Sequence, residues 1–167
     1  MLTAGSASAA TTFGAQASAA GMTGQQAQQL QRLVNGYVSQ TGGKQVSANR
    51  VNFAGGYVLV ASPGQRYAGD LASNKVTPYA YSSCGSGDFC AYSGPNGTGA
   101  LKAYYICQDV VPFTSGNGSV YNHQTGGAQT KLYKYNNGGG GIHLALTLNA
   151  GSTASWSWPN TADVRTC

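Results

Sequence analysis

The sequence is short of acidic side chains: its 167 residues include four aspartates and no glutamate. Acid–base catalysis by paired carboxylates needs two acids close together, and these aspartates are isolated. The serine hydrolase motif GxSxG is absent, and His123 and His143 lack the further ligand that a zinc site needs. We therefore expect that the protein is not an enzyme and that it uses no cofactor.

Charged side chains of either sign are also scarce, at 8% of the chain. The net charge of +5 reflects the lack of acids, because the nine Lys and Arg residues are scattered. Nucleic-acid binding needs clustered positive charge, and no apolar run approaches membrane-spanning length. We expect neither nucleic-acid binding nor membrane insertion. The abundant residues are glycine (25) and tyrosine (11), which suit short strands joined by many turns.

The four cysteines all lie in the second half of the chain, and none forms a CxxC pair. An even number of cysteines in such a chain indicates two disulfides and an oxidising compartment, so we expect a secreted, extracellular protein. Three pairings are possible, and we favour Cys84–Cys90 with Cys107–Cys167. The second bond would close a loop of about sixty residues, worth on the order of 4 kcal/mol through chain entropy.

The first 21 residues are of low complexity, rich in Ala, Ser, Thr and Gly. Such a segment buries too little apolar surface to fold alone, so we expect an extended tail. Either it is a passive linker, or it lies in a partner's groove or along a sheet edge, with Phe13 as its candidate contact.

Residues 22–80 are predicted to form a small helix–hairpin unit followed by a connector. Thr23 and Gln26 make a capping box for a helix over 23–41, which Gly42 and Gly43 end. Strands are expected over 44–53 and 57–61, with the hairpin turn at Gly55 and Gly56. Residues 63–80 are the predicted connector.

The remaining segment, 81–167, is predicted to be a β-sandwich or small barrel of short strands. Within it, a tyrosine precedes a glycine by seven positions twice, as Tyr92 with Gly99 and Tyr133 with Gly140. We expect each ring to cover a folded hairpin and each glycine to take a backbone conformation that other residues resist. The expected strands are 89–93, 100–107, 118–122, 129–135, 142–148 and 163–166.

Three stretches of this segment, CGSGDFCAYSGPNGTG, LYKYNNGGGG and WSWPNTADVRTC, resemble the βγ-crystallin family. More closely, they resemble the secreted actinobacterial proteins grouped with the Streptomyces metalloproteinase inhibitor. The resemblance implies a sandwich of two Greek keys over the C-terminal half, hence a mainly β chain that is α+β overall. It also implies a protease inhibitor or protease-interacting protein.

Many domains of that family bind calcium, but the corresponding segments here lack paired acids. Gly118 and Ala162 stand where a hydroxyl ligand is expected, and Gly97 stands where the family hairpin often has an aromatic residue. We therefore expect no functional calcium site. The degenerate calcium-like positions are Asn117, Ser119, Asn160 and Asp163.

Partner contacts are expected from loops beside the disulfides and from exposed aromatic side chains. Trp156 and Trp158 share one face if their segment is a strand, where they form either part of the core or a patch for a sugar or protein. The candidate reactive loops are Cys84–Cys90 and Gln108–Gly118. The candidate contact residues are Phe13, Gln108, Asp109, Phe113, Trp156 and Trp158.

The expected partner is another secreted protein, with a protease first among the candidates. The alternative is a non-catalytic adaptor or structural subunit of a secreted assembly, with the tail inserted into a partner. Carbohydrate binding and an antimicrobial, crystallin-like toxin are further interpretations that the composition leaves open.

Overall fold

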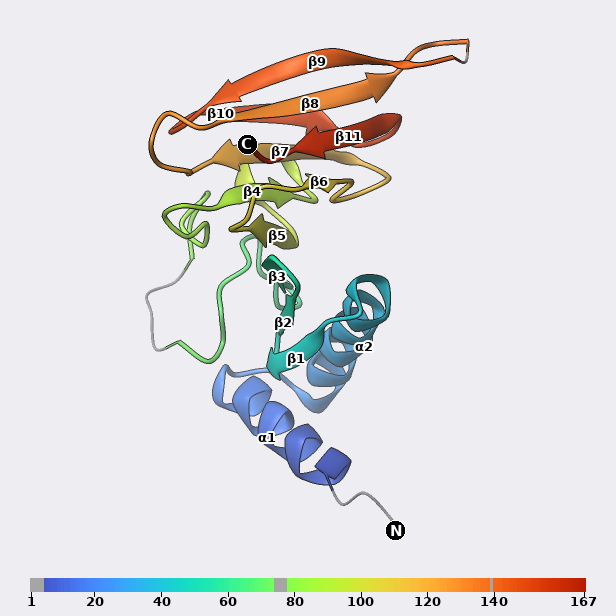
Figure 1. Ribbon diagram of the computed structural model, residues 1–167. Helices are drawn as coiled ribbons and strands as arrows, with labels where there is room; N and C mark the ends of the chain where they lie inside the picture. Colours follow the sequence, from blue (N-terminus) through green and yellow to red (C-terminus); the bar gives the residue numbers. More distant parts are fainter. Residues whose placement is uncertain (1–4, 74–77, 139) are drawn as a thin grey trace.

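The structure is a computed structural model that describes residues 5–73, 78–138 and 140–167, with the backbone alone for 5–11. In these ranges the chain is mainly β, with two antiparallel sheets and two α-helices (Figure 1). The helices are α1 (Gly5–Ala19) and α2 (Gly24–Thr41). The strands are β1 (Lys44–Ser47), β2 (Arg50–Phe53), β3 (Gly56–Leu59), β4 (Phe89–Tyr92), β5 (Leu101–Tyr104), β6 (Asp109–Val110), β7 (Asn117–Asn122), β8 (Gln129–Tyr135), β9 (Ile142–Asn149), β10 (Thr153–Ser157) and β11 (Thr161–Arg165).

The N-terminal segment is helical, so the prediction of an extended tail is wrong for residues 5–19. Alanine has the highest helix propensity, and the segment is rich in it. The helix docks on its own chain: Ala17 is buried, and the Gln16 side chain accepts a hydrogen bond from Ala48 N at 2.7 Å. Tertiary contacts therefore order a segment whose composition alone suggests disorder. Residues 1–4 of the predicted tail lie outside the described residues.

Helix α2 forms where its capping box predicts. Thr23 Oγ1 accepts from Gln26 N, the Gln26 side chain accepts from Thr23 N, and Gly42 closes the helix in a left-handed conformation. Leu30 and Val34 are buried against Val51, Val58 and Val60 of the sheet. The apolar stripe of α2 thus covers one face of β2 and β3.

The predicted strand over 44–53 is in fact two strands, β1 and β2, separated by a turn at Ala48 and Asn49. Asn49 is fully buried, and its side chain donates to the carbonyls of Val60 and Gly69 and accepts from Leu71 N. A buried polar side chain needs such partners, which the sequence alone does not reveal. This amide fixes the turn against the connector, of which residues 74–77 lie outside the described part.

Strand β3 pairs with β5 along its whole length, so the helix–hairpin unit and the C-terminal half share one sheet. The two backbones approach so closely that a Cβ at Gly56 would overlap the carbonyl oxygen of Ala103. The larger sheet therefore runs across the domain boundary predicted near residue 80. The larger sheet has the order β1-β2-β3-β5-β4-β7-β10, and the smaller one β6-β11-β8-β9.

The two sheets face each other across an apolar core, which makes the C-terminal half a β-sandwich. Phe89, Val120 and Trp158 contribute from the side of the larger sheet, and Leu132 and Val164 from the smaller. Strands β6 and β10, which the sequence analysis did not place, join the two repeats of the sandwich. β6 pairs with β11, and β10 pairs with β7, so each sheet contains one strand from the other repeat.

Both favoured disulfides are present. Cys84 is bonded to Cys90, and Cys107 is bonded to Cys167. The pairing Cys107–Cys167 ties the segment after β5 to the end of the chain, beside β11. No helix in the described part of the chain is long and apolar enough to cross a membrane.

Candidate partner-binding loop

The segment Tyr105–Phe113 follows β5 and presents apolar side chains to solvent. Tyr105 is 56% exposed, Ile106 47% and Val111 45%. The sequence analysis placed one of its two candidate reactive loops at 108–118, a range that leaves out Tyr105 and Ile106. The signal that could have indicated them is their position directly before Cys107, where a disulfide restrains the backbone.

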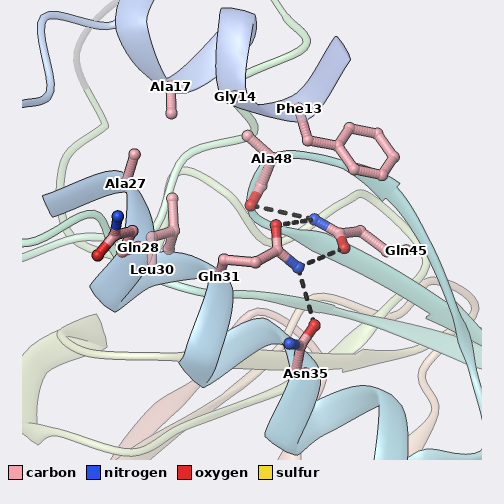
Figure 2. Close-up of a pocket in the computed structure, with 10 residues that line it drawn as sticks. All are labelled: Phe13, Gly14, Ala17, Ala27, Gln28, Leu30, Gln31, Asn35, Gln45 and Ala48. Carbon is pink, nitrogen blue, oxygen red and sulfur yellow. Dashed lines mark hydrogen bonds between the residues drawn. The ribbon is translucent and has the colours of Figure 1, made fainter. Parts of the chain in front are cut away.

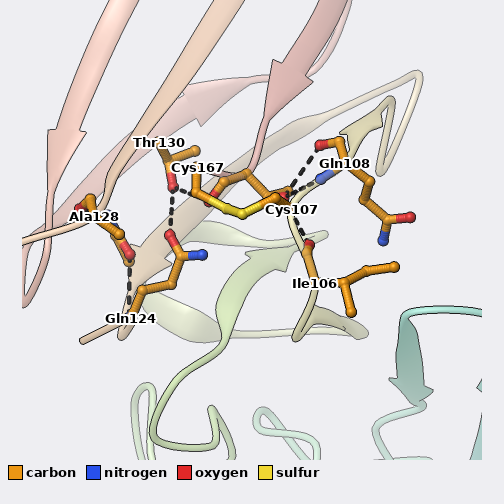
Figure 3. The surroundings of a disulfide bond; sticks show 9 residues. Ile106, Cys107, Gln108, Gln124, Ala128, Thr130 and Cys167 are labelled. Carbon is orange, nitrogen blue, oxygen red and sulfur yellow. Dashed lines mark hydrogen bonds between the residues drawn. A yellow bond between two sulfur atoms is a disulfide. The ribbon is translucent and has the colours of Figure 1, made fainter. Parts of the chain in front are cut away.

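The backbone of this loop is held by the C-terminal residues, as Figure 3 shows. Thr166 is fully buried, and its Oγ1 accepts from Gln108 N at 2.9 Å. The same hydroxyl lies 3.0 Å from Ile106 O and 3.1 Å from Gln108 O, so it donates to one of these carbonyls. Thr166 N donates to Gln108 O at 3.1 Å.

Two further contacts restrain the loop. Tyr105 N donates to Gly55 O at 3.0 Å, and the disulfide fixes Cys107 to Cys167. Hydrogen bonds and a covalent bond therefore hold the exposed Tyr105–Ile106 pair from both sides. A loop restrained in this way loses little conformational entropy when it binds.

Gln108 and Asp109 have different surroundings. Gln108 Nε2 is buried without a hydrogen-bond partner among the described residues, beside Gly55. Asp109 is exposed, and its carboxylate lies 4.0 Å from Arg165, a long contact that contributes little in water. Neither side chain belongs to a cluster of polar groups that could form a catalytic or metal site.

Trp156 and Trp158 belong to the core, which decides between their two interpretations. Trp158 is fully buried and donates its indole N–H to Tyr92 O at 3.0 Å. Trp156 is also buried and donates to Thr161 Oγ1 at 2.9 Å. The prediction that these rings contact a partner is corrected, because their surfaces are covered. Phe113 is half-buried, with its ring centroid 5.2 Å from that of Trp158.

Phe13 lies apart from the loop, on α1. It lines a groove of about 470 Å³ between α1, α2 and β1 (Figure 2). Ala17 and Leu30 form the apolar wall, and the amides of Gln31 and Gln45 form the polar wall, joined by hydrogen bonds of 2.8 and 3.2 Å. No charged side chain lines this groove among the described residues. The structure therefore does not gather the predicted contact residues at one place.

The other candidate reactive loop, Cys84–Cys90, has an inward-facing disulfide. Both cysteines are buried, and Asp88 inside the loop accepts a hydrogen bond from Tyr57 Oη at 3.1 Å. Burial, and then the Asp88 charge, raise the pKa of Tyr57 to about 12. Burial also raises the pKa of Asp88, although the Tyr57 hydroxyl opposes that shift. These groups make this loop a structural element.

The repeat glycines take the left-handed backbone conformation, with φ of 78° at Gly99 and 94° at Gly140. Tyr92 is buried in the core, where its hydroxyl has no partner among the described residues, and Tyr81 lies beside Gly97 of that hairpin. The ring of Tyr133 lies under the Arg165 guanidinium at 4.7 Å.

The calcium-like positions have other contacts. Ser119 is buried, accepts from Gly97 N and donates to Gly94 O. Asn160 has a positive φ of 61°. The Asp163 carboxylate accepts a hydrogen bond from Arg165 Nε at 3.1 Å. Asn117 is exposed at the start of β7. No cluster of three or more His, Cys, Asp or Glu side chains suited to a metal occurs in the residues that the structure describes.

Searches against known families, curated proteins and solved structures found no match for this chain.

Proposed function

We propose that the protein is a secreted protein-binding module that inhibits a protease through the loop Tyr105–Phe113. The observation that carries the proposal is the pairing of two exposed apolar side chains, Tyr105 and Ile106, with a backbone held by Thr166 and a disulfide. A protease inhibitor must place a side chain in the active-site cleft without reorganising. The loop has the required exposure and restraint.

The strand pairing supports the βγ-crystallin-like interpretation on which the proposal draws. A Greek key has four strands in which the fourth returns beside the first. Here β4 lies between β5 and β7, its second and fourth strands, while the third strand, β6, is in the other sheet. The second repeat has the same arrangement, with β8 between β9 and β11 and with β10 exchanged.

Secretion is supported by the disulfides. All four cysteines are paired, which fits an oxidising compartment. An inhibitor in such a compartment would meet secreted proteases.

The test is a titration against a thermolysin-type metalloprotease. We expect stoichiometric inhibition, and we expect Ile106→Glu to weaken it at least about ten-fold, because burial of an isoleucine side chain contributes roughly 1.5–3 kcal/mol. Leu33→Glu is the matched control, since Leu33 on α2 is also 47% exposed. Unchanged protease activity at excess wild-type protein would refute the proposal for this protease class.

The adaptor alternative is supported by the groove between α1 and α2, where four of the ten lining residues carry side-chain amides. A tagged copy recovered from culture supernatant would test it. Recovery with a stoichiometric partner that is lost on Phe13→Ala favours the adaptor, whereas recovery as a lone monomer counts against it.

A further inference from the structure

Strand β9 has a leucine or isoleucine at every second position: Ile142, Leu144, Leu146 and Leu148. In a regular strand all four would point to the same face. Leu148 is buried and Leu146 packs against the core, but Ile142 and Leu144 are exposed. The strand therefore changes face between Leu144 and Leu146.

The change of face is caused by a β-bulge at Ala145. Leu146 lies opposite Leu132 of β8, whereas Leu144 lies opposite the next residue, Tyr133. Leu132 is buried in the core, so its neighbour Tyr133 faces outward, and Leu144 follows Tyr133. Such bulges redirect side chains, often at functional sites.

The result is an apolar patch on the outer face of the smaller sheet, made of Tyr133, Tyr135, Ile142 and Leu144. Tyr135 is opposite Ile142 in the ladder and 57% exposed, while Ile142 and Leu144 are 44% and 49% exposed. The hairpin of β8 and β9 extends past β11 at this end (Figure 1). The patch therefore lies on a projecting element.

We propose that this outer-face patch binds an extended, acidic polypeptide segment that has apolar side chains. The area of the patch argues for a segment over a second folded copy. Three half-exposed side chains of this size present roughly 300 Å², whereas a stable interface between folded proteins buries about 800 Å² on each partner.

The main chain of β9 argues for a polypeptide. β9 is the edge strand of its sheet, so one side of its backbone has no neighbouring strand among the described residues. Extended peptides add to such edges through main-chain hydrogen bonds, and alternate side chains give specificity. The bulge limits regular pairing to the part before Ala145, which is where Ile142 and Leu144 lie.

The charges argue for an acidic segment. The β8–β9 hairpin contains Lys131 and Lys134 but no acidic residue. Lys134 faces the core side, where its Nζ donates to Ser157 O and Pro159 O, so Lys131 carries the outer-face charge of the hairpin. Lys131 faces outward and forms no ion pair within the described ranges. The nearest outward carboxylate on the neighbouring strand, that of Asp163, already pairs with Arg165 at 3.1 Å. A basic or neutral segment would leave Lys131 uncompensated.

The test uses the full chain labelled with ¹⁵N and a capped octapeptide of alternating Asp and Val. We expect the peptide to shift the amide resonances of β8 and of residues 142–147. The same peptide with Lys in place of Asp should bind at least about ten-fold more weakly, since the sign of every charge is reversed. Leu144→Thr should weaken binding about ten-fold, because it removes a buried leucine side chain from the complex.

Val46→Thr on β1 is the matched control, since Val46 is an exposed strand residue outside the patch, and it should bind the peptide as wild type does. Deletion of Ala145 leaves Leu144 opposite Tyr133 in an unbroken ladder, so Ile142 and Leu144 should stay on the outer face and the peptide should still bind. If that variant fails to fold, Leu144→Thr still decides the question. Absence of shifts at millimolar peptide, equal binding of the Lys peptide, or shifts confined to residues 105–113 would overturn the proposal. Concentration-dependent shifts without peptide would show that the occupant is a second copy, and would also overturn it.

Discussion

Replacement of Thr166 by valine should release the Tyr105–Phe113 loop without changing the shape of the core. The substitution removes the hydroxyl that accepts from Gln108 N and that donates to Ile106 O or Gln108 O. Gln108 O keeps its bond from Thr166 N, whereas the N–H of Gln108 loses its partner, as does Ile106 O where the hydroxyl donates to it. Thr166→Ser keeps the hydroxyl and loses only a methyl group.

The expected magnitudes separate the two variants. A buried donor left unsatisfied costs about 1–3 kcal/mol, so Thr166→Val should lower the free energy of unfolding by roughly 2 kcal/mol. The lost methyl group of Thr166→Ser should cost about 0.8 kcal/mol. If the loop opens locally, an opening that is roughly 2 kcal/mol easier raises amide exchange at Gln108 about thirty-fold.

Hydrogen exchange followed by NMR, with urea unfolding measured in parallel, would check this prediction. Thr161→Val is the control, because it removes a buried hydroxyl that accepts from Trp156 Nε1, outside the loop. It should destabilise the protein without accelerating exchange selectively at Gln108. Unchanged exchange at Gln108 in Thr166→Val, or equal losses of stability in the Val and Ser variants, would refute the reasoning.

Three further perturbations test other parts of the structure. Replacing Cys107 and Cys167 together by serine should cost about 4 kcal/mol in urea unfolding, since the bond closes a loop with a sequence separation of 60; a loss below 1 kcal/mol would contradict the chain-entropy account. Folding raises the pKa of Tyr57 from 10.0 to about 12, so the stabilisation that this shift represents is complete below pH 10 and is lost as the pH rises to 12. Tyr57→Phe should therefore reduce the alkaline fall in the free energy of unfolding by roughly 2–3 kcal/mol. An unchanged slope of that free energy against pH would count against the shift. Lys102 is buried, with its ammonium group near the rings of Tyr37 and Phe113, and burial lowers its pKa. Lys102→Met should therefore leave the free energy of unfolding unchanged or raise it. A loss of more than about 2 kcal/mol in that free energy would show that the cation–π contacts outweigh the cost of desolvation.

Local chemistry in the sequence determined the features that depend on neighbouring residues. Thr23, Gln26 and Gly42 define helix α2 because capping satisfies the end groups of a helix through residues three or four positions apart. Cysteine number left three disulfide pairings possible, and the favoured one is present. Most strands of the C-terminal half, but not β6 and β10, followed from the segments between glycine-rich turns. The exposed side of the loop beside Cys107 could be predicted only approximately, because accessibility is a property of the folded surface.

Contacts between distant residues decided the rest. Helix α1 forms on a surface that α2 and Ala48 provide, and the β3–β5 pairing merges two segments that differ in composition. The sequence left both a core and a surface interpretation open for Trp156 and Trp158, and the packing of the two sheets placed them in the core. The bulge at Ala145 has no local signature, because an alternating strand such as β9 is regular in sequence; the register of its partner β8 alone turns Ile142 and Leu144 outward. The sequence thus determined where helix α2 and most of the strands lie. The tertiary structure decided which side chains they leave for a partner, because burial and register depend on pairing between residues far apart in the chain.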